Sequence, residues 1–334
     1  MIGLIVGLTV GIAGALTGIG TGIKAGIDNK NANEINDLAQ NILNHAKKRI
    51  EVAKSASGKG LEVLGEKKIQ ILDNKVNEFI RLFEKIKNIS LEESSGLDEL
   101  SKFRIDKDNS FFELKNLGNL GASMAKGLAS GAVAGVLTAF GAYGAATTFA
   151  TASTGTAIAS LSGVAATNAT LAFFGGGSLA AGGLGVAGGT AVLGGMVAGP
   201  ALAILGIVMS AKASKKLDEA YSNKAEAQKI AAELNTATVM CNGIRRRAYL
   251  FQRLLIKCDT IFSPLLYEME KIQVISGVDY NKYTIEQKQT IARALSLAGT
   301  IKAILDTPIL TEEGNLTSES EKIGIDINQS LIIK

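Results

Sequence analysis

Two long stretches of the chain place apolar residues at the three-to-four spacing of an amphipathic helix. The first runs from 33 to about 89, with Gly58 and Gly60 as its weakest point, and the second runs from 212 to 263, just before Pro264. Neither stretch contains a proline, so each would extend for about 75–85 Å as an unbroken helix. We predict that these two helices lie antiparallel and bury their apolar stripes against each other as a stalk.

The segments on the carboxyl side of this stalk differ in character. A smaller helical section follows Pro264 and is expected to pack on the base of the stalk, so that 212–307 forms a long return helix and a helical cap. Residues 308–334 are polar and rich in turn-forming residues, and we expect a flexible tail there.

Between the two amphipathic stretches lies a block without charge. Residues 127–211 contain no Asp, Glu, Lys, Arg or His over eighty-five positions. Part of so long a segment would have to reach the surface of an ordinary globular protein, so we expect it to lie in a membrane or in a buried assembly that can transfer into one. Breaks rich in glycine divide the block into three expected spans, with two or four as the alternatives.

The amino-terminal segment, 1–27, is apolar and carries glycine on a four-residue beat. No charged side chain precedes Lys24, and the 23 residues ahead of it would span about 34 Å as a helix, enough for a bilayer core of roughly 30 Å. A secretory signal peptide is the alternative. Rows of small residues let helices approach closely in lipid, so we predict helix packing, against another copy or against the central block, at the glycines of 1–27 and of the early block. These are Gly3, Gly7, Gly11, Gly14, Gly18, Gly22, Gly127, Gly131 and Gly135.

Charge and cysteine content narrow the choice of partners. The formal net charge of +4 is too small to imply nucleic-acid binding, but it suits contact with anionic headgroups. Lys126, Lys212, Lys215 and Lys216 bracket the uncharged block, where a headgroup layer would lie, and they favour the cytoplasmic side for both of its ends. The only two cysteines stand 17 residues apart on one expected helix and cannot pair within it, which favours a reducing compartment.

Catalytic chemistry is not evident in the sequence. His45 is the only histidine, and the glycine-rich runs lack the Lys-Ser/Thr of a P-loop. The basic clusters 47–49 and 245–247 would meet headgroups or nucleic acid, or, as we favour, lie on solvated faces or pair with the facing helix. We therefore do not expect an enzyme, and we expect no cofactor, no metal and no nucleic acid as a ligand.

The segment STGTAIASLSGVAATNATLAFFGGGSLAAGGLGVAGGTAVLGGMVAGPA, 153–201, resembles a pattern in uncharacterised bacterial Ala/Gly-rich glycine-zipper membrane proteins with long flanking helices. It is similar in texture to the small interferon-inducible Ala/Gly-rich membrane proteins of animals. The plan of long helices around an apolar hairpin resembles α-helical pore-forming toxins and colicin pore domains. These resemblances imply perturbation of a membrane and carry no catalytic residues.

The sequence thus predicts an all-α protein with a long antiparallel helical stalk and a Gly/Ala-rich hydrophobic membrane block. Its expected parts are a glycine-zipper helix at 1–27, a long amphipathic helix and connector at 28–116, the membrane block at 117–211, the return helix and cap at 212–307, and the tail.

The predicted function is membrane insertion, oligomerisation and permeabilisation of a lipid bilayer, as a pore-forming toxin or a defence effector. The alternative is a scaffold or tether that does not permeabilise and recruits a protein partner along the stalk. We expect the bacterial inner membrane with the stalk in the cytoplasm, or a soluble form that inserts on activation.

Overall fold

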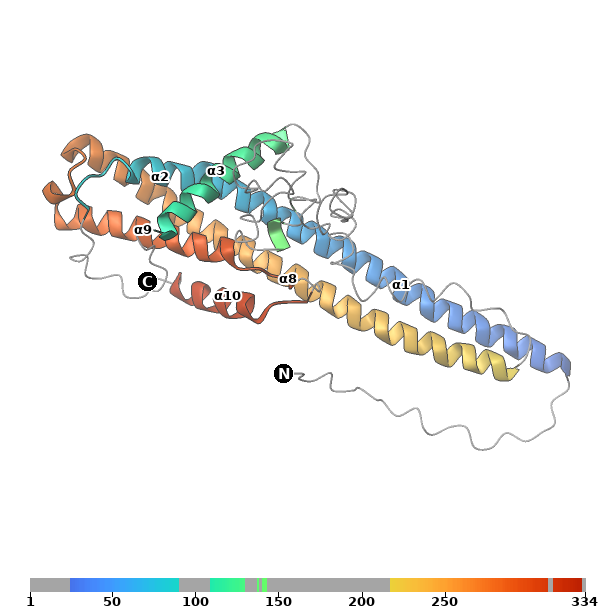
Figure 1. Cartoon of the computed structure of the whole chain (residues 1–334). Coiled ribbons are helices and arrows are strands. Elements are labelled where there is room, and N and C mark those ends of the chain that lie inside the picture. Colours follow the sequence, from blue (N-terminus) through green and yellow to red (C-terminus); the bar gives the residue numbers. More distant parts are fainter. Residues whose placement is uncertain are drawn as a thin grey trace.

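Two helices, α1 (Ala25–Gln70) and α8 (Leu217–Ser276), run antiparallel along most of the molecule in this computed structural model (Figure 1). The structure describes residues 25–89, 109–129, 137, 140–142, 217–311 and 315–331. Within these ranges the chain is mostly helical and forms no strand, which confirms the predicted all-α class. Nothing that the sequence predicts for 1–24 or for most of the uncharged block falls within these ranges.

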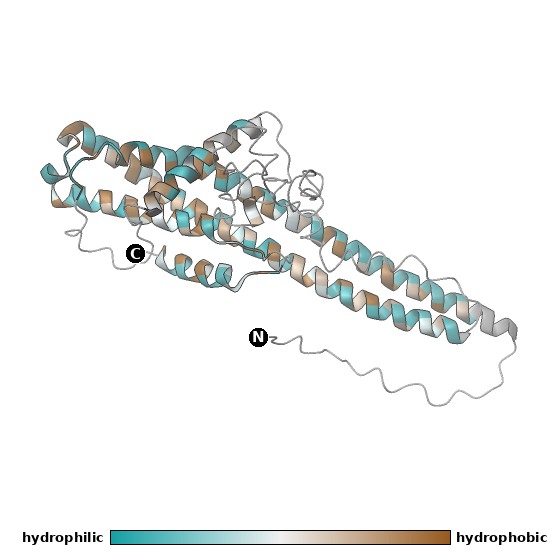
Figure 2. Ribbon diagram, in the orientation of Figure 1, coloured by the Kyte–Doolittle hydropathy of each residue, from teal (hydrophilic) through white to brown (hydrophobic). Residues whose placement is uncertain are grey.

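The outer part of the α1–α8 pair, which we call the stalk, is held by small and medium apolar side chains. Their sequence spacing brings them to one side of each helix, where they bury against the partner helix (Figure 2). Alanine predominates, so the two backbones approach closely. The predicted antiparallel pairing of the two amphipathic stretches is thereby confirmed. The stalk cores consist of Ala39, Leu43 and Ala227, and of Ala46, Ile50, Ala53, Ala231, Leu234, Ala237 and Cys241.

Helix α1 continues through Gly58 and Gly60 without a break, and its irregularity lies further along. A π-helical turn, η1 (Ile71–Val76), separates α1 from α2 (Asn77–Phe83). Such a turn inserts one extra residue into the helix and rotates everything beyond it. The two-helix stalk gives way before this turn to a larger cluster of helices, which we call the head and whose core begins at Leu61 of α1 and Ile244 of α8.

Helix α8 also runs straight past Pro264 to Ser276, so the sequence-based expectation of a break at this proline is wrong. Proline removes the hydrogen bond to the carbonyl four residues earlier and crowds it. Here the ring faces solvent, while Phe262 and Leu266 on either side are completely or almost completely buried in the head. Tertiary packing on the buried side therefore outweighs the local cost of the proline.

The head adds α3 (Asn109–Ala129), a short 3-10 turn η7 (Tyr280–Lys282), α9 (Ile285–Asp306) and α10 (Ser318–Ser330) to the ends of α1 and α8. Helix α9 begins with a capping box between Thr284 and Gln287 and is buried along most of its length. Aromatic rings pack together in the core of the head. The ring centroid of Phe79 lies 5.3 Å from that of Phe83 and 5.6 Å from that of Phe262.

Helix α10 lies in the segment for which the sequence predicts a flexible tail, and that prediction is wrong for Ser318–Ser330. The Thr317 side chain caps its first turn by accepting a hydrogen bond from the backbone N–H of Ser320. Ile327 is completely buried against the head, and Arg247 of α8 holds Ser320 at 2.8 Å. The cap and the isoleucine are the signals that the polar composition of the segment obscured.

The two cysteines form no disulfide with each other, as the sequence predicts, and both are buried on α8. Burial raises the pKa of the Cys258 thiol to about 12 and also raises that of Cys241. Since the thiolate is the reactive form, we expect neither cysteine of the folded protein to react with a disulfide reagent at pH 8 within minutes, and both to react in urea. Fast labelling of either one without denaturant would contradict this packing of α8.

Candidate functional site at the start of the uncharged block

Residues of the uncharged block lie inside the helical head. Beyond α3, the structure describes Leu137 and 140–142 of the block, and their backbone is helical. They form the short green segment beside α1 in Figure 1. Leu137, Phe140 and Ala142 are each at most 5 % exposed. A segment with the composition of a membrane helix is therefore anchored, at its beginning, in a protein core.

Two glycines bring this segment and α1 into direct backbone contact. A β-carbon on Gly65 of α1 would lie 2.0 Å from the carbonyl oxygen of Leu137. A β-carbon on Gly141 would likewise lie 2.0 Å from the carbonyl oxygen of Leu61. Only glycine on both sides permits such an approach. The contact resembles in kind the small-residue packing of membrane helices, although it occurs here between a stalk helix and the block.

A buried lysine completes the contact. Lys68, one turn after Gly65, is completely buried, and its Nζ donates hydrogen bonds to the carbonyl oxygens of Phe140 at 3.0 Å and Gly141 at 3.5 Å. The same Nζ lies 5.6 Å from the centroid of the Phe140 ring. A cation that binds carbonyl groups at the end of a helical turn satisfies acceptors which the turn itself leaves open.

The charge of Lys68 is costly in this position. Loss of hydration lowers its pKa to about 7, and the nearby carboxylate of Asp306 on α9 opposes that effect only in part. Burial raises the pKa of Asp306, while Lys302 donates a hydrogen bond to its Oδ2. Lys302 also binds Glu113 of α3 at 2.8 Å. The block is thus anchored over a group of charges that α1, α3 and α9 share and that runs from the buried Lys68 to the half-exposed Glu113.

The far end of the segment is tied to the chain that follows α9. The carbonyl oxygen of Ala142 accepts hydrogen bonds from the backbone N–H of Ile309 at 2.7 Å and of Leu310 at 3.1 Å. We call these contacts together the clamp: Gly65 and Lys68 of α1, and the backbone of 309–310, against Leu137 and 140–142. It combines backbone contacts with one buried charge.

Most of the residues for which the sequence predicts membrane roles lie outside the described ranges. Those residues are Gly3, Gly7, Gly11, Gly14, Gly18, Gly22, Gly131, Gly135, Lys212, Lys215 and Lys216. Gly127 lies in the last turn of α3, and Lys126 beside it is exposed. The predicted packing and headgroup roles of all these residues stay predictions.

Sequence reasoning missed the glycines that do pack helices together in the head. Besides Gly65 and Gly141, these are Gly118 and Gly121 of α3, whose spacing of three was the available signal. A β-carbon on Gly121 would lie 2.4 Å from that of Leu72 in the π-helical turn. Lys68 gave no signal, because a lysine within an amphipathic helix is ordinarily on its solvated face.

Three further expectations concern the stalk and the described helices. His45 is exposed on α1, and across the described residues no group of three or more His, Cys, Asp or Glu side chains is placed to hold a metal ion. Among the helices of these ranges, none has both the length and the apolar character that crossing a membrane requires. Of the basic cluster at 245–247, Arg247 pairs with Glu321 of α10 at 3.5 Å.

Comparison of the chain with protein families, with curated proteins and with solved structures finds no significant match.

Proposed function

We propose that this protein permeabilises a lipid bilayer, and that its helical head shelters the uncharged block before insertion. The observation that carries the proposal is the clamp, in which the block's Leu137 and 140–142 are buried against α1. An uncharged segment of eighty-five residues is rare in proteins that stay in water. A protein that delivers such a segment to lipid needs a contact that holds the segment before insertion and releases it at insertion.

The clamp has the properties of a releasable contact. Its polar part consists of carbonyl groups bound by Lys68 and by two backbone N–H groups, and those carbonyls would be re-bonded if the segment continued as a helix in lipid. Its apolar part is small, since it buries mainly Leu137 and Phe140. Release would therefore sacrifice few contacts compared with what insertion of the block's helices as a packed group gains.

The lipid bilayer and other copies of the chain are the proposed partners. Marginally apolar Ala/Gly helices are expected to insert as a packed group, because each alone gains little from lipid. The proposed state on the membrane is an oligomer with the stalk in the cytoplasm, and no enzymatic step forms part of it.

The first test measures dye release from anionic vesicles together with flotation of the same sample. We expect the wild-type protein to float with the vesicles and to release dye, and Gly7→Leu with Gly18→Leu to lose release while retaining helicity by circular dichroism. Undiminished dye release by the double variant would contradict the predicted packing role of these glycines. Flotation without release by the wild type would contradict permeabilisation and favour a scaffold that recruits a partner along the stalk.

A further inference from the structure

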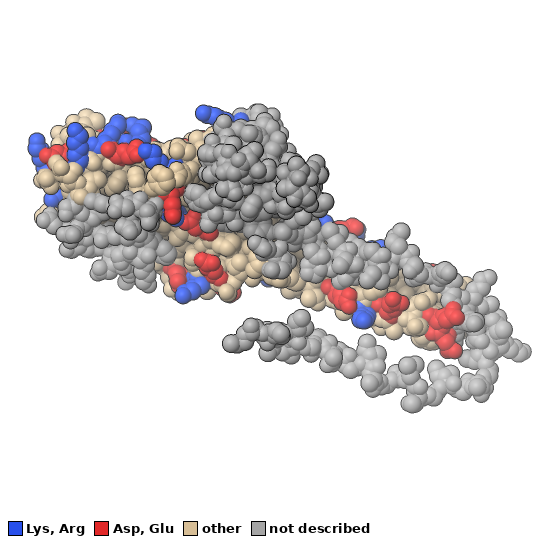
Figure 3. Space-filling view, in the orientation of Figure 1, with Lys and Arg blue, Asp and Glu red and all other residues tan. Residues whose placement is uncertain are grey.

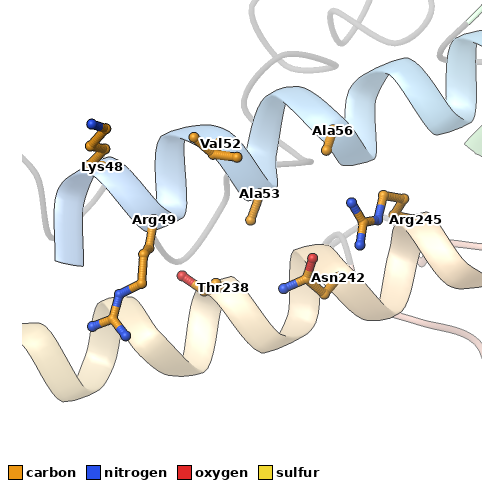
Figure 4. A pocket seen from close by; sticks show the side chains of 8 residues that line it. All are labelled: Lys48, Arg49, Val52, Ala53, Ala56, Thr238, Asn242 and Arg245. Carbon is orange, nitrogen blue, oxygen red and sulfur yellow. The ribbon is translucent and has the colours of Figure 1, made fainter. Parts of the chain in front are cut away.

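The stalk carries a groove that is lined by basic side chains of both helices (Figure 4). It has a volume of about 430 Å³, within the range of pockets that hold small molecules. Its apolar lining consists of Val52, Ala53 and Ala56 of α1. Lys48, Arg49 and Arg245 supply its positive charge.

The two arginines approach the groove from opposite helices. In Figure 4, Arg49 extends from α1 towards α8, and Arg245 extends from α8 towards α1. Gly60 of α1 lies beside the second of these, since a β-carbon there would be in ordinary contact with Cγ of Arg245 at 3.5 Å. Asn242 of α8 adds an amide that can donate hydrogen bonds between them.

The lack of acidic partners distinguishes this groove from other places where basic side chains reach across between helices. Lys67 binds Asp259 at 2.7 Å, and Arg81 binds Glu270 at 3.3 Å. Figure 3 shows basic and acidic side chains next to one another on the head. In the groove, by contrast, none of the lining residues is acidic.

The three cations of the groove, Lys48, Arg49 and Arg245, form no ion pair and no hydrogen bond with any other residue that the structure describes. Positive charges on both helices disfavour the pairing of those helices, and an anion bound beside them would reduce that cost. The groove therefore has the electrostatic character of an anion site.

We propose that this groove binds the phosphate group of a small anionic ligand. Guanidinium groups match phosphate oxygens in paired, charge-assisted hydrogen bonds, and a phosphate monoester carries close to two negative charges at neutral pH. The apolar lining, which includes the 63 % exposed Val52, accommodates the organic part of the ligand. A soluble phosphate ester and the headgroup of phosphatidic acid share this chemistry.

The test uses the full chain at low ionic strength and glycerol 3-phosphate as the probe in calorimetric titration. Arg49→Gln with Arg245→Gln removes two charges that line the groove. Lys47→Gln with Arg246→Gln is the matched control, because it removes the same charge one residue away in each cluster from positions that do not line the groove. We expect the groove variant to bind about tenfold more weakly or worse, and the control to bind within about twofold of wild type.

A second arm identifies the source of the phosphate. Flotation with vesicles containing phosphatidic acid, against vesicles of phosphatidylcholine alone, is measured for the same three proteins. Binding of glycerol 3-phosphate that only the groove variant loses supports a soluble ligand, and vesicle binding that only the groove variant loses supports the lipid headgroup. Equal loss in both variants, or no binding in either arm, overturns the proposal. The soluble arm does not depend on permeabilisation, so its result is independent of the function proposed above.

Discussion

Replacing Gly65 with alanine should detach the start of the uncharged block from α1. The added β-carbon would lie 2.0 Å from the carbonyl oxygen of Leu137, 2.7 Å from its carbonyl carbon and 3.0 Å from its α-carbon. All three are backbone atoms, so no side-chain rotation relieves the overlap. We expect a loss of about 2 kcal/mol or more in the stability of the clamp. Faster hydrogen exchange at the amides of 140–142 and earlier dye release from vesicles would report it.

The matched control for this variant lies on the same helix. Gly58 is two turns earlier in α1, and a β-carbon there would have no neighbour within 4 Å. Gly58→Ala should therefore stabilise the stalk by up to about 1 kcal/mol, because alanine favours the helix, and should leave exchange at 140–142 unchanged. If Gly65→Ala behaves like Gly58→Ala, the close backbone contact does not exist in the protein.

The second large effect is a dependence of stability on pH that Lys68 creates. Its pKa is about 7 in the folded protein against 10.5 for an ordinary lysine, so between these values the unfolded chain binds more protons than the folded one. The free energy of unfolding therefore rises with pH between these two values: the contribution of a neutral Lys68 is fully present above pH 10.5 and is lost as pH falls towards 7. We expect a gain of about 2 kcal/mol between pH 7 and pH 9, measured by urea unfolding.

The groups that face Lys68 do not cancel this gain in that window. The raised pKa of Asp306 starts from 3.8 and acts at lower pH, while Lys302, with a raised pKa, loses its contribution only as pH rises past 10.5. The remaining charged group of this cluster, Glu113 of α3, forms an ion pair with Lys302. Cys258 and Cys241 oppose the trend to a small extent as pH approaches 9, because their thiols stay protonated in the fold and begin to ionise in the unfolded chain.

Lys68→Met isolates the effect, and its neighbour supplies the control. Methionine fills a similar space without a proton to exchange, so the variant should show little change in stability between pH 7 and pH 9. Lys67→Met, which breaks the ion pair with Asp259 but keeps Lys68, should retain the gain of the wild type. An equal slope in all three proteins would place the titrating group elsewhere.

The stalk could be predicted from the sequence because its signal is repeated many times. Each turn of α1 and α8 contributes an apolar position on the same side, so the pairing does not depend on any single residue. Pro264, the π-helical turn and α10 could not be predicted in this way. Each depends on contacts with distant parts of the chain, such as the burial of Phe262 and Ile327, which override the local pattern.

For the candidate site, the sequence predicted the kind of contact, close packing of helices at glycines, but not the residues that make it. The sequence indicated that glycines would let helices of this chain approach closely, and the described glycines that do so are those at Gly65, Gly118, Gly121 and Gly141. Isolated glycines in an amphipathic helix resemble weak points until their partner is known. Lys68 could not be predicted at all, because its burial arises only when the block covers α1.

The separation between the stalk cores and the head core also bears on how this architecture can change in evolution. The stalk cores end at Ala53 of α1 and Cys241 of α8, and the core of the head begins at Leu61 and Ile244. Paired gains or losses of about seven residues, two helical turns, in α1 and α8 would keep the same sides of both helices in register. Such changes would alter the reach of the molecule and would leave the core of the head, with its hold on the block, unchanged.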